Sequence, residues 1–316
     1  MVRKIIIDTD TGSDDAAAIM MAVAASDVEI MGVTTLGGNI TLEQTTKNAL
    51  QTLEVCDAEI PVYPGSSGPI MRELVTASGV HGKDGMGDQD LVHPKGKPEK
   101  QHAVDFILDT VKKNPDEVEL VVLGPATNVA LAIMQDRETM SHVKHIWSMG
   151  TAGFGSGNCT PVAEFNVYVD ADSYAVMLTS GIPITIIGFD LCLGPAAMQR
   201  EDLEFLKNAS KAGTFVAKCT TALLNYNLQK RGEYFVDLPD AVAMGVALWP
   251  DIVQDSVSAY CYCCTKEEPA YGQVIIFDVN QPLSIDYEIP PANAQVIRKI
   301  DFKEFKSRFK NAIAEL

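Results

Sequence analysis

The chain has 316 residues, 47% of them hydrophobic and 21% charged, which suits one large α/β domain or two modest ones and excludes a largely disordered chain. Its formal net charge of −17 argues against nucleic-acid binding, because an acidic surface repels phosphate backbones. Seven scattered cysteines without a CxxC pair argue against a disulfide scaffold or a zinc site, and no stretch approaches the ~20 apolar residues of a membrane span, so we expect a cytoplasmic protein.

Short β-branched runs alternate with helical patterns over the first 190 residues, beginning with a strand at 3–8 and a helix at 14–25. This alternation predicts an open, mostly parallel α/β sheet with helices on both faces, related to the Rossmann architecture. In such sheets the active site lies beyond the carboxyl ends of the strands. We expect further strands at 28–35, 60–65, 118–124, 143–150 and 182–190, and further helices at 41–55, 101–113, 126–134 and 170–180.

The pattern changes after residue 190, where helical stretches precede short strands. We interpret this part as a helical cap and a small β appendage within a single domain over residues 1–316, because no linker, repeat or low-complexity tract divides the chain. The Gly-rich segment 64–101 is weakly periodic and is either a lid or a surface loop. We expect cap helices at about 199–209, 211–230 and 239–248, strands near 256–264, 272–279 and 294–301, and a charged C-terminal helix.

Four aspartates, Asp8, Asp10, Asp14 and Asp15, fall within eight residues where the first strand ends and the first helix begins. An aspartate at a helix start gains about 1 kcal/mol or less from capping and the helix dipole, which explains one such residue but not three or four. Carboxylates this close repel one another, and no Lys or Arg lies between residues 5 and 46. A hard divalent cation such as Ca²⁺ or Mg²⁺ is the simplest counter-charge.

Asp10 and Asp15 are candidate ligands of this cation, and Asp14 beside them could point at a bound molecule. A further carboxylate from elsewhere would complete the coordination sphere. Asp240, at the start of another predicted helix, is the candidate, although helix capping alone also explains an aspartate at that position.

The stretch DTDTGSDDAAAI resembles the signature of the inosine–uridine-preferring nucleoside hydrolases, which is roughly D-x-D-x-G-x-D-D on a strand, a turn and a helix. Similar blocks follow in the family's order, so that the resemblance runs from residue 3 to about 250. It implies Ca²⁺-dependent hydrolysis of the N-glycosidic bond of a ribonucleoside to free base and ribose, by a homodimer or homotetramer. The further blocks are TTLGGNITLEQTTKNA, HGKDGMG, LGPATNVALA, GNCTPVAEFNVYVDADSYAVM and LPDAVAM.

The resemblance also implies roles for individual residues. Asp10, Asp15 and Asp240 match carboxylate ligands of the ion, and Leu123 matches a position that offers its backbone carbonyl. Asp10 further matches the base that takes a proton from the metal-bound water. Five residues match positions that hydrogen-bond the ribose hydroxyls, although each taken singly could instead cap a helix, sit in a turn or lie on the surface: Asp14, Asn39, Asn158, Glu164 and Asn166.

These residue types suit the chemistry that the resemblance implies. The transition state of glycoside hydrolysis resembles an oxocarbenium ion, so that positive charge develops on the sugar. Carboxylates and amide oxygens around the sugar stabilise that charge. A bound metal ion lowers the pKa of its water and orients the water and the sugar diol.

The chain departs from the family pattern beside the last metal aspartate. Many family members carry a histidine there that is linked to protonation of the leaving base, whereas this chain has Pro239, which has no ionisable group. His81 matches a position that contacts the base and is our candidate catalytic residue on that side. Tyr226, Arg231 and Tyr234 precede Asp240 and could also face the base, so the preferred base and the group that protonates it stay open.

Two rival functions compete with hydrolysis. A haloacid-dehalogenase-type phosphatase would use Asp8 as the nucleophile of a D-x-D-x-T/G motif, but its late acidic motif is missing, because the sequence GDQDL at 87–91 comes too early and is spaced wrongly. A non-catalytic or altered-specificity nucleoside or sugar binder on the same scaffold is the second alternative, since the usual histidine is lost. The presence of all the metal and water-activating positions argues against it.

Overall fold

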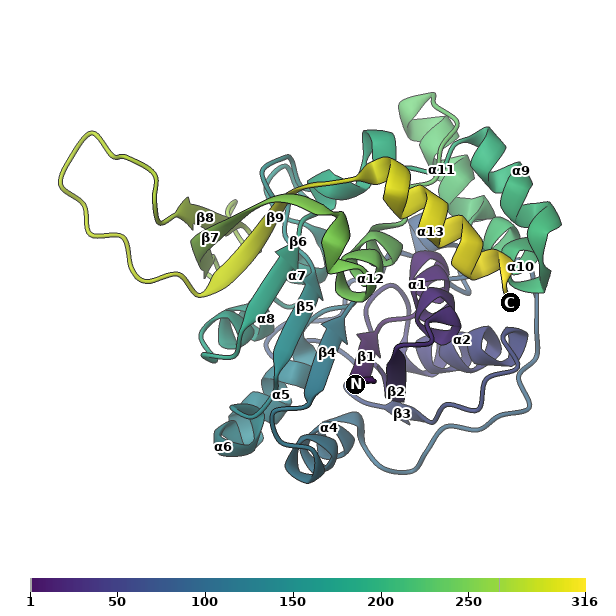
Figure 1. The fold of residues 1–316 in the computed structure, drawn as a ribbon, viewed down its shortest axis with the longest axis horizontal. Coiled ribbons are helices and arrows are strands. Elements are labelled where there is room, and N and C mark those ends of the chain that lie inside the picture. The colour runs from purple at the N-terminus through teal and green to yellow at the C-terminus, as the bar shows by residue number, and fades with distance from the viewer. Residues whose placement is uncertain (1, 267) are drawn as a thin grey trace.

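A nine-stranded, mostly parallel sheet forms the centre of the molecule (Figure 1). The computed structural model describes residues 2–266 and 268–316. The strand order is β3-β2-β1-β4-β5-β6-β9-β7-β8, in which neighbours are parallel from β3 to β9 and antiparallel from β9 to β8. The strands are β1 (Arg3–Thr9), β2 (Val28–Thr35), β3 (Val62–Pro64), β4 (Val118–Val122), β5 (His145–Met149), β6 (Ile184–Ile187), β7 (Val253–Cys263), β8 (Val274–Asp278) and β9 (Ala294–Ile300).

Helices cover both faces of this sheet (Figure 1). One face carries α1 (Ser13–Ala24), α2 (Leu42–Val55), α12 (Pro239–Leu248) and α13 (Phe302–Ala314), and the other carries α4 (Ala103–Lys113), α5 (Thr127–Gln135), α6 (Arg137–Met140) and α8 (Ala171–Leu178). The predicted α/β fold class is therefore confirmed. The other helices are α3 (Ser78–His81), α7 (Phe165–Val169), α9 (Arg200–Ala209), α10 (Lys211–Cys219) and α11 (Thr221–Arg231), with 3₁₀ turns at Phe189–Cys192, Gly194–Ala196 and Pro250–Ile252.

The alternation of side chains along β1 explains why the sheet has two apolar layers. Ile5 and Ile7 belong to the core under α1 and α12, whereas Ile6 belongs to the core under α4, α5 and α8. All three isoleucines are at most 1% exposed. A strand that is buried on both faces reads as a continuous apolar run, and this is why RKIIID was recognisable as a parallel strand.

The connection between strands changes direction beside β1, and this places the site. The chain proceeds from β1 outward to β2 and β3, and then returns to the other side of β1 to form β4, β5 and β6. In doubly wound sheets the crevice at such a switch point, beyond the carboxyl ends of the strands, is where ligands bind. Here the residues that follow β1 and β4 lie at that edge.

The C-terminal half differs from the expected elements in two details. The helix expected over 211–230 is two helices, because the hydroxyls of Thr220 and Thr221 bond back to the carbonyls of Val216 (2.8 Å) and Lys218 (2.7 Å) where α10 ends and α11 begins. The C-terminal strands continue the main sheet, since β9 pairs in parallel with β6. None of the described helices combines the length and apolar character that a membrane crossing requires.

Candidate functional site

The turn between β1 and α1 presents three aspartates at the carboxyl edge of the sheet. Asp15 fixes this turn, since one carboxylate oxygen accepts the backbone N–H of Gly12 (2.8 Å) and the other accepts the hydroxyl of Thr9 (2.5 Å). Asp14, in the same first helical turn, is buried with 4% exposure. Only one of these aspartates is needed to cap the helix, so the others are left for another purpose.

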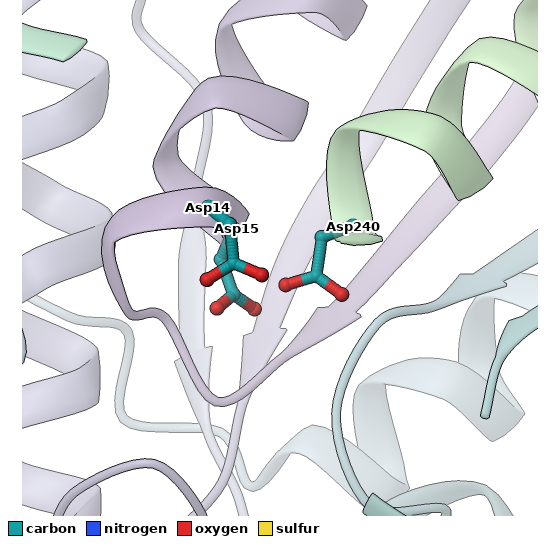
Figure 2. Close-up of side chains that lie close together, drawn as sticks. All are labelled: Asp14, Asp15 and Asp240. Carbon is teal, nitrogen blue, oxygen red and sulfur yellow. The ribbon is translucent and has the colours of Figure 1, made fainter. Parts of the chain in front are cut away.

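A fourth aspartate reaches the same point from a distant part of the sequence. Asp240 lies in the first turn of α12, whose N1 position is Pro239, and α12 packs against α1. Figure 2 shows Asp14 and Asp15 at the start of α1 with their carboxylates directed towards that of Asp240. One carboxylate oxygen from each of these three residues lies within 4.8 Å of the other two.

Asp10 lies beside this cluster and has one oxygen without a partner. Its Oδ2 accepts the backbone N–H of Asn39 (2.6 Å), whereas Oδ1 is buried and has no hydrogen bond among the described residues. Asp14 Oδ1 is in the same condition. Buried acceptors without a donor are rare in folded proteins, and two in one place fit a binding site for a cation or a hydrogen-bond donor.

Keeping the four buried carboxylates charged costs free energy. Burial raises the pKa of Asp14 and of Asp15 to about 6, with repulsion from Asp14 adding to the effect on Asp15. Burial, followed by repulsion from the neighbouring aspartates, holds the pKa values of Asp10 and Asp240 well above their ordinary range. A divalent cation bound by oxygen ligands would relieve both penalties, so the donor set fits a hard metal ion.

The carbonyl of Leu123 lies at the end of β4 and faces the same region. The Leu123 N–H donates to the carbonyl of Asp8 (2.8 Å), which continues the β1–β4 pairing by one residue. Its carbonyl accepts the side-chain amide of Asn166 (2.6 Å). This contact brings a predicted metal-binding carbonyl and a predicted sugar-binding amide together.

The short helix α7 carries two of the predicted ribose-binding residues. Glu164 is the N-cap of α7, and its carboxylate accepts the backbone N–H of Asn166 (2.9 Å) and of Val167 (3.3 Å). Burial raises the pKa of Glu164 to about 7 in spite of these hydrogen bonds. Asn158 Oδ1 accepts the N–H of Phe165 (2.8 Å), which ties the preceding loop to the same helix.

One pocket collects the predicted substrate residues. The adjoining helices α3 and α11 contribute the apolar and aromatic side chains of Val80, Leu223 and Tyr226, which suit a flat ring. Asp10, Asp15 and Leu123 are not part of the lining and lie beneath it. The lining includes all five predicted ribose-binding residues together with His81 and Asp240, and it also contains Ala77, Val80, Met149, Cys159, Phe165, Phe189, Leu223, Tyr226, Asn227, Arg231, Asp237 and Pro239.

His81 reaches this pocket from the long segment 64–101. It ends the four-residue helix α3, where its Nδ1 lies 2.9 Å from the hydroxyl of Ser13 and 3.6 Å from Asp14 Oδ1. Burial lowers the pKa of His81, so the neutral ring is favoured, and Asp15 and Asp237 oppose this effect. Part of the segment 64–101 therefore lines the pocket.

Two buried pocket residues were not predicted from the sequence, and one residue that was expected at the base lies elsewhere. Asn227 donates to Asp237 (2.8 Å) and to the carbonyl of Phe235 (3.1 Å), so that α11 is tied to the segment before α12. Asp237 stands three residues before Asp240, just outside α12, and this closeness in the sequence could have drawn attention to it. Tyr234 was expected to be able to face the base, but it lies outside the pocket lining and its ring is covered by the guanidinium of Arg200 at 3.8 Å.

A second layer of hydrogen bonds supports the carboxyl end of β1. Asp8 is fully buried and accepts hydrogen bonds from Thr34 (2.6 Å) and from the side chain of Asn128 (2.8 Å). Burial raises its pKa to about 6. Asp8 has no place in the pocket lining, which leaves the phosphatase reading without its nucleophile.

Comparison with known proteins agrees with this geometry. The family model described as inosine-uridine preferring nucleoside hydrolase matches residues 5–307. The non-specific ribonucleoside hydrolase RihC of Escherichia fergusonii is 34% identical over 317 residues, covering 100% of this chain and 99% of that protein. Uridine nucleosidase 1 of Arabidopsis thaliana is 36% identical over 252 residues, covering 79% of this chain and 75% of that protein.

A solved structure is similar over the whole length. The plant nucleoside hydrolase PpNRh1 superposes with a TM-score of 0.93 at 28% sequence identity, covering 100% of both chains. The agreement extends over the sheet, the cap helices and the C-terminal strands alike.

Proposed function

Because the chain belongs to the inosine–uridine-preferring nucleoside hydrolase family, and thus is an enzyme that hydrolyses ribonucleosides to base and ribose, we propose that its reaction depends on Ca²⁺ and on a water activated by Asp10. The observation that carries this proposal is the unpartnered Asp10 Oδ1 beside the buried carboxylates of Asp14, Asp15 and Asp240. Four carboxylates gathered at one pocket can both hold a hard cation and accept a proton.

We assign the ion to Asp10, Asp15, Asp240 and the carbonyl of Leu123. Asp15 and Asp240 contribute to the cluster of carboxylate oxygens, and the Leu123 carbonyl lies at the neighbouring strand end. When bound, the ion would lower the pKa of a water and orient the sugar diol. Asp14 belongs to the same cluster and also lines the pocket, which fits a residue shared between the ion and the sugar.

Asp10 is suited to take the proton of the attacking water. Its Oδ2 is held by the N–H of Asn39, so the carboxylate has a fixed orientation, and Oδ1 remains as the free acceptor. A Cβ at Gly38 or at Gly124 would collide with this carboxylate, so both glycines are needed for its position. A positioned base of this kind contributes roughly 10²- to 10⁴-fold to a rate.

The remaining predicted residues stabilise the sugar as the glycosidic bond breaks. Glu164 and Asn166 project from the start of α7, and Asn39 and Asn158 lie on the loops beside it. Their oxygens can accept hydrogen bonds from ribose hydroxyls and counter the positive charge of an oxocarbenium-like transition state. We propose that Asp14, Asn39, Asn158, Glu164 and Asn166 together bind the ribose.

His81 is proposed to act on the side of the base. It lines the pocket from α3, which packs against α11, and its Nδ1 lies within hydrogen-bond distance of the Ser13 hydroxyl (2.9 Å). Since Pro239 occupies the position next to Asp240, no ionisable side chain is available there. We propose that His81 contacts the leaving base from α3.

The proposal is tested by the release of reducing sugar from inosine, guanosine, adenosine, uridine and cytidine. Purified protein should contain Ca²⁺ on metal analysis, and wild type should hydrolyse at least one nucleoside. Asp10→Ala should abolish this release, whereas Asp27→Ala, which changes an exposed aspartate beyond the opposite end of α1 from the cluster, should not. Release that persists in Asp10→Ala would contradict the role of Asp10.

The alternative is a nucleoside or sugar binder without activity, favoured by the loss of the histidine at position 239. Calorimetry distinguishes the two, because a binder would take up a nucleoside without releasing sugar. We further propose a homodimer or homotetramer, to be checked by light scattering. A cytoplasmic location also remains our proposal and rests on the scattered cysteines of the sequence.

A further inference from the structure

One face of α11 lines the pocket, and its middle residue, Asn227, is hydrogen-bonded to Asp237 (2.8 Å). Leu223, Asn227 and Arg231 line the pocket and stand four residues apart, which places them in one row along the helix. Leu223 and Asn227 are buried, and Arg231 at the last position of the helix is exposed. The row therefore leads outward and ends in a guanidinium at the mouth.

Arg231 is distinguished by its charge. Among the described residues that line the pocket it is the one Lys or Arg, whereas Asp14, Glu164, Asp237 and Asp240 are carboxylic acids. Its guanidinium lies 5.4 Å from the ring centroid of Phe235, and no ion pair with a carboxylate is found for it within the part of the chain that the structure describes. Its donors are thus available to a ligand.

The position of Arg231 determines which part of a nucleoside it would meet. The proposed ribose-binding residues lie at the starts of α1 and α7 and on two loops, whereas Arg231 is the exposed last residue of α11, on another part of the pocket lining. The edge of the base that is farthest from the sugar carries the substituent at C6 of a purine or C4 of a pyrimidine. A guanidinium has five N–H donors and no acceptor, so it favours an oxygen there over an amino group.

We propose that Arg231 is the residue that determines specificity for the leaving base, an assignment that rests on the proposed function. It binds the carbonyl oxygen of 6-oxopurines and 4-oxopyrimidines and disfavours the corresponding 6-amino and 4-amino bases. When the bond between C1′ and the ring nitrogen breaks, its electron pair stays with the base, and the resulting anion is shared between that nitrogen and the carbonyl oxygen. The guanidinium stabilises this anion and keeps its proton, and water protonates the base after it has left.

This assignment accounts for the proline beside Asp240. A chain that stabilises an anionic leaving group by a fixed cation has less need of a proton donor at position 239. Hydrogen bonds to charged groups are worth about 1.5 to 3 kcal/mol. Removal of the cation should therefore lower kcat/KM for the oxo-nucleosides by about 10- to 100-fold. The kcat/KM values of the amino-nucleosides should change little, because these substrates gain nothing from this contact.

The test compares kcat/KM for two matched pairs, inosine with adenosine and uridine with cytidine, in Ca²⁺-loaded protein. Wild type should prefer the oxo member of each pair by about 10-fold or more. Arg231→Gln should lose this preference through slower hydrolysis of inosine and uridine, and Arg231→Lys should retain part of it, because lysine keeps the charge without the planar fork. Lys230→Gln is the matched control, since it removes an exposed cation from the neighbouring residue of α11, outside the pocket lining, and should leave all four values unchanged.

The possible failures are distinguishable. Wild type that hydrolyses both members of each pair equally well, or an Arg231→Gln variant that slows all four nucleosides by the same factor, would overturn this inference and leave the proposed function standing. Absence of hydrolysis of every nucleoside by the Ca²⁺-loaded wild type would refute the proposed function itself, and this inference with it.

Discussion

Replacement of Glu119 by glutamine should destabilise the protein without changing its chemistry. Glu119 lies on β4 at the amino end of the sheet and is 3% exposed. Both oxygens of its carboxylate accept hydrogen bonds from Arg3 (3.2 and 2.5 Å), and Lys144 and Trp147 each donate one more (2.9 Å). Burial alone would raise the pKa of Glu119, but these donors outweigh it and lower the pKa from 4.5 to about 2.

The size of the effect follows from that change in pKa. A fall from 4.5 to about 2 corresponds to about 3 kcal/mol of stabilisation of the folded state when the group is ionised. Because the side chain of Lys144 is 49% exposed, water screens part of its contribution, and we expect a loss of about 2 to 3 kcal/mol in Glu119→Gln at pH 7. The folded pKa lies below the unfolded one, so this stabilisation is complete above pH 4.5 and is lost as the pH falls towards 2.

Urea unfolding of wild type and Glu119→Gln between pH 7 and pH 3 measures this difference directly. The gap between the two midpoints should narrow as the pH falls, and kcat at pH 7 should be unchanged. Glu117→Gln is the matched control, because the Glu117 side chain is 59% exposed and pairs with Lys4 in solvent, where an ion pair is worth about 1 kcal/mol or less. A stable Glu119→Gln variant, or a gap of equal size at pH 7 and pH 3, would refute the reasoning.

Three further perturbations test the carboxyl end of the sheet. Gly38→Ala should lower kcat by at least about 10²-fold, because a Cβ there collides with the Asp10 carboxylate, while Gly79→Ala, which meets no atom within 4 Å, should keep full activity in the same sugar-release assay. Asn128→Ala removes a donor from the buried Asp8 and should cost about 1 to 3 kcal/mol in urea unfolding at pH 7. Chelation of divalent ions should abolish activity and lower the melting temperature, and added Ca²⁺ should restore both; unaltered melting would count against a bound ion.

The elements of the fold could be predicted because their signals are local. The run Ile5–Ile7 followed by a turn and an Ala-rich helix identifies a buried strand, its carboxyl end and the helix that covers it, all within about 20 residues. The break at Thr220 could not be predicted in the same way, since it depends on hydroxyls that compete with the main chain for carbonyls of the preceding turn. The place of β9 next to β6 is a choice between distant partners, and no local pattern encodes it.

The residues of the candidate site could be predicted where they stand close together in the sequence, and less well where only the fold brings them together. Asp10, Asp14 and Asp15 stand together in the sequence, so the mutual repulsion of their carboxylates is enough to predict a bound cation. Asp240 lies more than 200 residues away, and its place at a helix start made it a candidate that capping explained equally well until the resemblance connected it with the others. Asn227 and Asp237 were missed because the contact between them links two segments through space.

The two ends of the sheet show why the buried acids of this protein have different roles. Glu119 at the amino end and Asp10 at the carboxyl end are both buried. The oxygens of Glu119 are surrounded by donors and cations, so its pKa falls and its effect is on stability. Asp10 has one oxygen without a donor and other carboxylates beside it, so its pKa rises and the fold loses stability by holding it there. In most of this protein the local preferences of the sequence agree with the fold. The buried, mutually repelling aspartates are the exception, because only a bound ligand would make them favourable. This argues that the carboxyl end of the sheet is the functional site.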